Sequence, residues 1–86
     1  MHFEFNENKS LANKEKHGID FIEAQELWGD IDRLIIPVRN VEEPRFLIIS
    51  KLRINIWSAL FTMRQEKIRI ISVRRARKEE IFIYEG

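Results

Sequence analysis

The chain is 86 residues long, which leaves room for one domain, and its 44% hydrophobic and 34% charged residues are typical of a folded protein rather than a disordered one. It has no cysteine, which excludes a disulfide framework and a thiolate metal site. Its apolar runs are too short to cross a bilayer, and its first residues do not form a secretory signal. We therefore expect a single domain over residues 1–86, in a soluble, cytoplasmic protein that does not contact a membrane.

The charge is divided unevenly along the chain. The net charge is +1, but residues 1–44 hold five Lys/Arg against ten Asp/Glu, a balance of −5, whereas residues 45–86 hold ten against four, a balance of +6. Such a division predicts either a polyanion-binding surface in the C-terminal half or a dimer of complementary halves. An unevenly charged, solvated surface without a partner is the plainer alternative.

The first residues predict a short strand and a helix. Residues 2–5 alternate between polar and apolar side chains, as a strand does. Asn6 is suited to cap a helix through Lys16, because its side-chain oxygen can accept a hydrogen bond from an N–H group of the first turn. Gly18 is suited to end that helix, since glycine adopts the left-handed conformation at low cost.

A second helix is predicted directly afterwards. Asp20 and Glu23 have the spacing of a capping box, and Gly29 followed by Asp30 is a stop signal. Apolar residues at helical spacing between these signals should form one buried stripe. The stripe consists of Phe21, Ala24, Leu27 and Trp28.

Four strands should follow and form an antiparallel sheet. The third has apolar residues in both of its alternating sets, which is typical of a central strand covered on both faces. A short polar connection, Gln65-Glu66-Lys67, predicts that the last two strands form an antiparallel hairpin. The four strands are expected at residues 34–38, 45–50, 54–63 and 68–73.

The segment from 75 to 84 favours a final helix, because it opens with charged residues and contains Glu79-Glu80. The alternation within residues 81–84 leaves a strand open as the alternative. The order of the elements predicts an α+β domain. In it, an antiparallel sheet of about four strands plus a short N-terminal strand packs with two N-terminal helices and one C-terminal helix.

Basic residues are the strongest chemical signal. The sequence has no glycine-rich nucleotide loop, zinc pattern or Ser-His-Asp set, so neither a metal site nor a cofactor is expected. Arg69 interrupts an apolar strand and therefore needs a partner, while Arg64 and Arg74 lie near the ends of the last hairpin. Guanidinium groups can hold phosphate bidentately and stabilise charge that grows on phosphorus. A strand edge protected by charge against aggregation is the alternative for this set.

His17 is the candidate for proton transfer, because an imidazole exchanges protons near neutral pH. Its neighbour Lys16 is the second candidate. A purely structural role for His17 is slightly favoured over this one, since a histidine at a helix end can donate a hydrogen bond to the last carbonyl groups.

Blocks at both ends of the sequence resemble the BrnT family of bacterial toxins. The first block comprises Phe3-Glu4-Phe5, Lys9, Asn13, Lys16-His17-Gly18-Ile19, Phe21 and Glu23-Ala24. The second runs from Ile68 to Glu79 and is closed by Tyr84. The sequence departs from the usual family pattern at Phe5, Asn6, Ser50 and Arg77, where tryptophan, aspartate, glycine and threonine are common.

The resemblance implies a compact RelE-like fold and a metal-free endoribonuclease toxin that inhibits translation. It also implies a cognate, DNA-binding, BrnA-like antitoxin as partner, with a homodimer or a heterotetramer left open. In this role Arg64, Arg69 and Arg74 would bind phosphate and stabilise charge, and His17 or Lys16 would carry the proton. Further RNA contacts would come from Lys51, Arg53, Arg75, Arg77, Lys78 and Tyr84. The alternative is a non-catalytic RNA- or protein-binding module, or a decayed toxin, that uses the same basic half.

Overall fold

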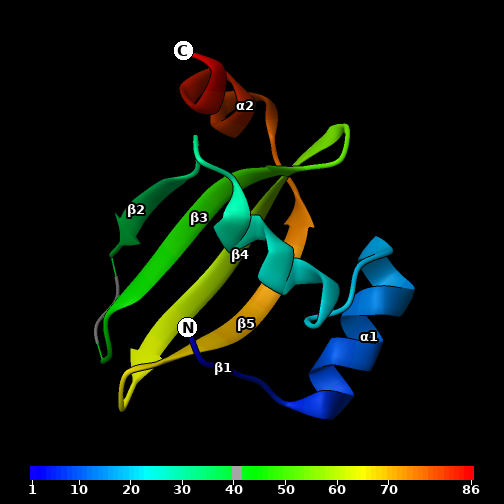
Figure 1. Cartoon of the computed structure of the whole chain (residues 1–86), viewed down its shortest axis with the longest axis vertical. Coiled ribbons are helices and arrows are strands. Elements are labelled where there is room, and N and C mark those ends of the chain that lie inside the picture. The colour runs from blue at the N-terminus through cyan, green and yellow to red at the C-terminus, as the bar shows by residue number, and fades with distance from the viewer. Residues whose placement is uncertain (40–41) are drawn as a thin grey trace.

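The computed structural model describes residues 1–39 and 42–86, which form five strands and three helices (Figure 1). None of the helices in these two ranges is long and apolar enough to cross a membrane. In chain order the elements are β1 (Phe3–Glu4), α1 (Glu7–His17), η1 (Glu23–Gly29), β2 (Leu34–Val38), β3 (Arg45–Leu52), β4 (Asn55–Arg64), β5 (Lys67–Arg75) and α2 (Lys78–Glu85).

Both predicted caps of α1 are confirmed. The side chain of Asn6 accepts a hydrogen bond from the Lys9 N–H at 3.0 Å. Gly18 adopts a left-handed conformation with φ of 81°, and its N–H donates to the Lys14 carbonyl at 2.9 Å. The side chains that α1 buries are polar, namely Ser10 and Asn13, so specific hydrogen bonds rather than apolar burial must hold this helix in place.

The capping box after α1 is also confirmed, but the helix that it starts is a 3₁₀-helix. The Asp20 carboxylate accepts from the Glu23 N–H at 2.8 Å, and the Glu23 carboxylate accepts from the Asp20 N–H at 2.9 Å. The helix η1 begins at Glu23, and Gly29 ends it after seven residues. A 3₁₀-helix has three residues per turn, so it aligns Ala24 with Leu27 on the buried side.

The sheet has the order β1-β5-β4-β3-β2. The four predicted strands are antiparallel, but the predicted short N-terminal strand joins them as a fifth, so the sheet is mixed rather than antiparallel throughout. The four long strands are antiparallel, whereas β1 pairs with β5 in parallel, with Phe3 opposite Ile68. The direction of β1 has a simple cause. The chain must pass from β1 into α1, and α1 is bonded to Val73 near the C-terminal end of β5.

The hairpin of the last two strands and the central position of β4 are confirmed. Arg64 pairs with Lys67, which leaves a two-residue loop in which both residues have positive φ. Both faces of β4 are covered, although the most buried side chains on the second face are those of Ser58 and Thr62 rather than aliphatic ones. The strand β5 extends through Arg75, so α2 begins at residue 78 instead of 75.

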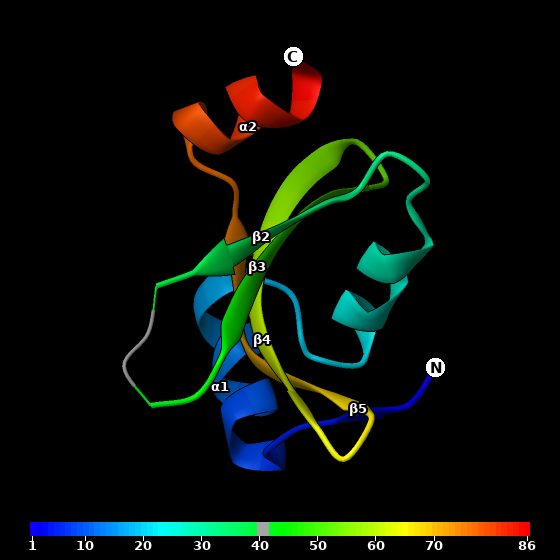
Figure 2. The same cartoon turned by 90° about the vertical axis from the view of Figure 1, so that its left-hand side faces the viewer.

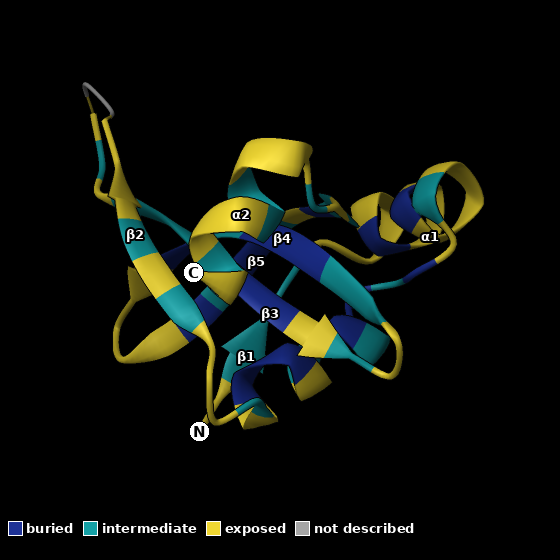
Figure 3. Ribbon diagram, turned by 90° about the horizontal axis from the view of Figure 1, so that it is seen from above, coloured by how far each residue is buried: buried dark blue, intermediate teal, exposed yellow. Residues whose placement is uncertain are grey.

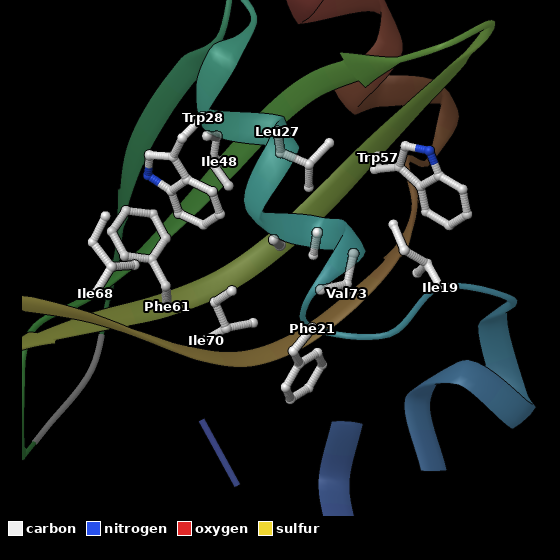
Figure 4. Packing of buried hydrophobic residues seen from close by; sticks show 12 residues of the cluster. Ile19, Phe21, Leu27, Trp28, Ile48, Trp57, Phe61, Ile68, Ile70 and Val73 are labelled. Atoms are coloured by element: carbon white, nitrogen blue, oxygen red, sulfur yellow. The ribbon is translucent and has the colours of Figure 1, made fainter. Parts of the chain in front are cut away.

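The apolar core lies between η1 and one face of the sheet (Figure 4). The ring of Trp28 is in edge-on contact with Phe3 and Phe61, with centroid distances of 5.1 Å in both cases. Figure 2 shows η1 against this face and α2 at one end of the sheet. Every residue of α2 remains partly exposed, as the yellow and teal ribbon of Figure 3 shows, so α2 contributes little to the core.

Candidate active site

Asn13 fixes α1 against the outer edge of β5. Its side-chain amide donates to the Val73 carbonyl at 2.9 Å and accepts from the Val73 N–H at 3.2 Å. It also donates to the Ile19 carbonyl at 2.8 Å, beyond the end of α1. Because β1 is only two residues long, the Asn13 amide takes the place that a neighbouring strand would occupy farther along β5.

A bulge in β5 opens a hollow beside this attachment. Leu60 pairs with Ser72 and Phe61 pairs with Ile70, so Ile71 is an extra residue in the ladder. The hollow between α1 and β5 has a volume of about 270 Å³. It is lined by Lys9, Ala12, Asn13, Lys16, His17, Phe21, Ile71 and Ser72. We refer to it below as the α1–β5 hollow.

The α1–β5 hollow has a basic rim and a partly apolar floor. Lys9 and Lys16 are exposed on its rim, His17 is half-buried, and none of the described residues that line it is acidic. The nearby carboxylate of Glu23 is bonded to Lys14 at 2.8 Å, and this hydrogen bond lowers the pKa of Glu23. The hollow can therefore attract an anion, and it offers an imidazole for proton transfer.

The structure pairs each of the three predicted phosphate-binding arginines with a carboxylate. Arg69 lies 3.3 Å from Glu4, and Arg64 lies 3.7 Å from Glu43. Arg69 and Arg74 share one face of β5 with Ser72, because the bulge keeps all three opposite alternate residues of β4. Neither Arg69 nor Arg74 lines the hollow, although both share a strand face with Ser72, which does, and Arg64 lies at the far end of the hairpin.

Arg74 forms the tightest of these pairs. Its guanidinium donates two hydrogen bonds to the Glu80 carboxylate, at 2.8 and 2.9 Å. The same carboxylate accepts from the Ser58 hydroxyl and from the Arg77 N–H. The Arg74 guanidinium, helped by these two donors, outweighs desolvation and lowers the pKa of Glu80 to about 2. Arg74 therefore anchors α2 to the sheet.

Asp30 provides the second anchor of α2. Its carboxylate accepts from the Tyr84 hydroxyl at 2.5 Å and from the Lys51 N–H at 2.8 Å. Burial alone would raise the pKa of Asp30, but the hydrogen bonds from Tyr84, Lys51 and Asp32 outweigh it and lower that pKa. The bond to Asp30 in turn raises the pKa of Tyr84 to about 12.

Residues 5–80 match the family model of BrnT, described as the ribonuclease toxin of a type II toxin–antitoxin system. The chain belongs to the BrnT family. A search among curated proteins finds no match. This match confirms the resemblance seen in the two sequence blocks. A type II ribonuclease toxin family implies a protein antitoxin as partner and RNA as substrate.

The structure divides the predicted site residues of this BrnT protein into separate groups. Lys16 and His17 lie in the α1–β5 hollow. The predicted RNA contacts lie at the other end of the sheet, near α2, where the Arg75 guanidinium stacks on Trp57 at 5.6 Å from the ring centroid. Those contacts are Lys51, Arg53, Arg75, Arg77, Lys78 and Tyr84.

Sequence reasoning did not place Lys9 and Asn13 in the site. A signal for them was available, because Lys9, Asn13 and Lys16 recur at helical spacing on one side of α1. It also missed the partners Asp30 and Glu80. Glu80 lies three residues after the helix cap Arg77, which is the capping-box spacing, whereas nothing local connects Asp30 to Tyr84.

Proposed function

We propose that this BrnT protein is a metal-independent endoribonuclease that binds the scissile phosphate in the α1–β5 hollow. One observation carries the proposal: α1 gathers Lys9, Lys16 and His17 around a hollow whose opposite wall includes the Ser72 hydroxyl. Two ammonium groups attract phosphate, and the imidazole can accept and return a proton. Family membership supports RNA as the substrate.

Such a site can use the substrate's own 2′-hydroxyl as nucleophile. In the proposed reaction neutral His17 takes the proton of this hydroxyl, whose oxygen forms a bond to the adjacent phosphorus. The ammonium group of Lys16 stabilises the negative charge that grows on the phosphoryl oxygens. The bond from phosphorus to the 5′-oxygen then breaks, and the imidazolium returns its proton to that oxygen. The products are a 2′,3′-cyclic phosphate and a 5′-hydroxyl.

The three arginines are assigned different roles, because a carboxylate holds each of them with different strength. Arg69 makes a single 3.3 Å contact with a half-exposed Glu4, so a phosphate can compete for it, and we assign it to the next phosphate along the RNA. Arg64 is exposed and is assigned to a more distant part of the strand. Arg74 is held by two hydrogen bonds, so it can bind phosphate only if Glu80 moves away.

We further propose that cleavage inhibits translation and that a BrnA-like, DNA-binding antitoxin neutralises the toxin. The type II family supports a protein antitoxin. This part is tested by adding the purified chain to a cell-free translation reaction, with and without its cognate antitoxin. Synthesis should stop with the toxin alone and recover with the antitoxin.

The catalytic assignment is tested with a synthetic RNA that spans a cleavage site first mapped in cellular RNA. His17→Gln should lower the cleavage rate by about 10²-fold or more, the usual size of general acid–base effects. Lys16→Gln and Lys9→Gln should weaken RNA binding and make it less salt-dependent. Lys67→Gln, an exposed lysine outside the hollow, is the matched control and should behave as wild type.

Two results would overturn the proposal. The first is a full cleavage rate for His17→Gln in a folded protein. The second is cleavage of a substrate that carries 2′-deoxyribose at the mapped site, since that sugar has no 2′-hydroxyl to attack phosphorus. RNA binding without any product would favour the alternative, a non-catalytic binding module or a decayed toxin.

A further inference from the structure

Asp30 brings three distant segments together at the end of the molecule that carries α2 (Figure 1). Its carboxylate is bonded to Tyr84 of α2 and to the backbone N–H of Lys51, which precedes the β3–β4 turn. Asp30 itself is the C-cap of η1. The ends of η1, β3 and α2 therefore share one surface, and it lies at the opposite end of β5 from the hairpin that carries Arg64.

Each of these segments exposes a large apolar side chain beside its attachment to Asp30. Ile31 is 89% exposed, Ile54 is 87% exposed and Phe82 is 78% exposed, and Ile83 is half-exposed next to it. The helix α2 is held by Glu80 and Tyr84, which leaves Phe82 pointing away from the anchors. An exposed apolar cluster of this kind marks an interaction site rather than an ordinary surface. We name these four residues the α2-end patch.

Basic side chains surround the α2-end patch. The exposed acidic residues nearby are fewer, namely Asp32, Glu79 and Glu85. A cationic rim around an apolar centre complements a protein segment with an apolar stripe and acidic neighbours. Three of the four patch residues are isoleucines, which offer no flat ring on which a base can stack, and Phe82 supplies a single ring, so the patch suits protein better than RNA. The exposed basic residues are Lys51, Arg53, Arg75, Arg77 and Lys78.

We infer that the α2-end patch is the surface on which the antitoxin docks, through an acidic amphipathic segment. The inference rests on the proposed function for the existence of a neutralising partner, which a type II family implies. The patch residues and the basic rim belong to the three segment ends that Asp30 joins. Lys51 and Arg53, which the sequence predicted to contact RNA, would then contact the antitoxin instead.

The test uses the purified cognate antitoxin, titrated against toxin variants by calorimetry. Phe82→Gln and Ile54→Gln should each weaken antitoxin binding by about 30-fold, the size expected of a central interface residue. Lys51→Gln combined with Arg53→Gln should weaken it less and reduce its salt dependence. The matched controls are Leu11→Gln, within α1, and Ile22→Gln, just before η1, which are similarly exposed but lie outside the patch.

All variants should unfold at temperatures close to that of wild type, since the replaced side chains are exposed. Equal antitoxin affinity for wild type, Phe82→Gln and Ile54→Gln would overturn the inference, as would an equal loss in the two controls. Weaker RNA binding with unchanged antitoxin binding would assign the patch to RNA instead. RNA cleavage is measured separately on each variant. If Phe82→Gln and Ile54→Gln still cleave RNA but are no longer neutralised by the antitoxin, the inference is supported. If these variants lose antitoxin binding and the wild-type chain never cleaves RNA, the inference stands and only the proposed enzyme is contradicted.

Discussion

Removing the carboxylate of Glu80 should loosen α2 and destabilise the whole domain. In the folded protein the pKa of Glu80 is held at about 2 by Arg74, by the Arg77 N–H and by Ser58, whereas its ordinary value is 4.5. At about 1.4 kcal/mol per pKa unit this gap corresponds to about 3 kcal/mol at neutral pH. Arg74 is partly exposed, so solvent screening reduces this figure. We expect Glu80→Gln to lower the free energy of unfolding by about 2–3 kcal/mol.

The pH dependence gives this prediction a second, independent check. Because the folded-state pKa of Glu80 is lowered, its stabilising effect is present above about pH 4.5 and is lost as the pH falls through about 2. Wild type should therefore lose its advantage over Glu80→Gln between about pH 5 and pH 2. At pH 2.5 the difference in the free energy of unfolding should be below about 1 kcal/mol.

The assay is urea unfolding of wild type and Glu80→Gln at pH 7 and at pH 2.5, with Glu79→Gln as control. Glu79 is exposed on the same helix turn, so its replacement should change the free energy of unfolding by less than about 0.5 kcal/mol. A loss for Glu80→Gln no larger than for Glu79→Gln, or a loss that is the same at both pH values, would refute the reasoning.

Three further perturbations test the remaining anchors. Asn13→Ala should lower the free energy of unfolding by about 2–3 kcal/mol, measured by thermal unfolding, because it removes three buried hydrogen bonds. It should also speed hydrogen exchange at the Val73 amide, and unchanged exchange would contradict the role of Asn13. Arg77→Thr should stabilise the chain by about 1 kcal/mol, since a hydroxyl at the cap of α2 can accept from the first turn, and a lowered unfolding temperature would contradict it. Tyr84 is the only tyrosine, so an ultraviolet titration of the phenol should show one midpoint near pH 12. The hydrogen bond to Asp30 should stabilise the fold below about pH 10 and be lost above about pH 12. A midpoint near pH 10 in the folded protein would contradict this hydrogen bond.

Local signals predicted the parts of the fold that depend on residues close together in sequence. The caps of α1 at Asn6 and Gly18, and the hairpin around Gln65, each follow from a few neighbouring residues. The parallel pairing of β1 could not be predicted in this way, because it joins Phe3 to Ile68. Its direction is decided by the need to place α1 beside the end of β5.

The candidate site was predictable to a similar extent. The need of Arg69 for a partner was predicted from its apolar strand, and Glu4 supplies that partner. The basic residues could be named from sequence, but which of them a carboxylate neutralises depends on contacts across the fold. Asp30 meets Tyr84 across 54 positions, and Asn13 meets Val73 across 60. Sequence spacing therefore cannot distinguish an anchoring arginine from a phosphate-binding one.

Because the proposed active site lies between α1 and β5, it can form only after β5 has been synthesised. Lys9, Lys16 and His17 leave the ribosome early, but the opposite wall of their hollow, Ile71 and Ser72, is made only after β4 has been completed. A nascent chain that ends at Arg64 has no α1–β5 hollow at all. Toxicity should therefore arise only after β5 has been made, which leaves a translating cell the interval between the synthesis of α1 and that of β5 to supply the antitoxin.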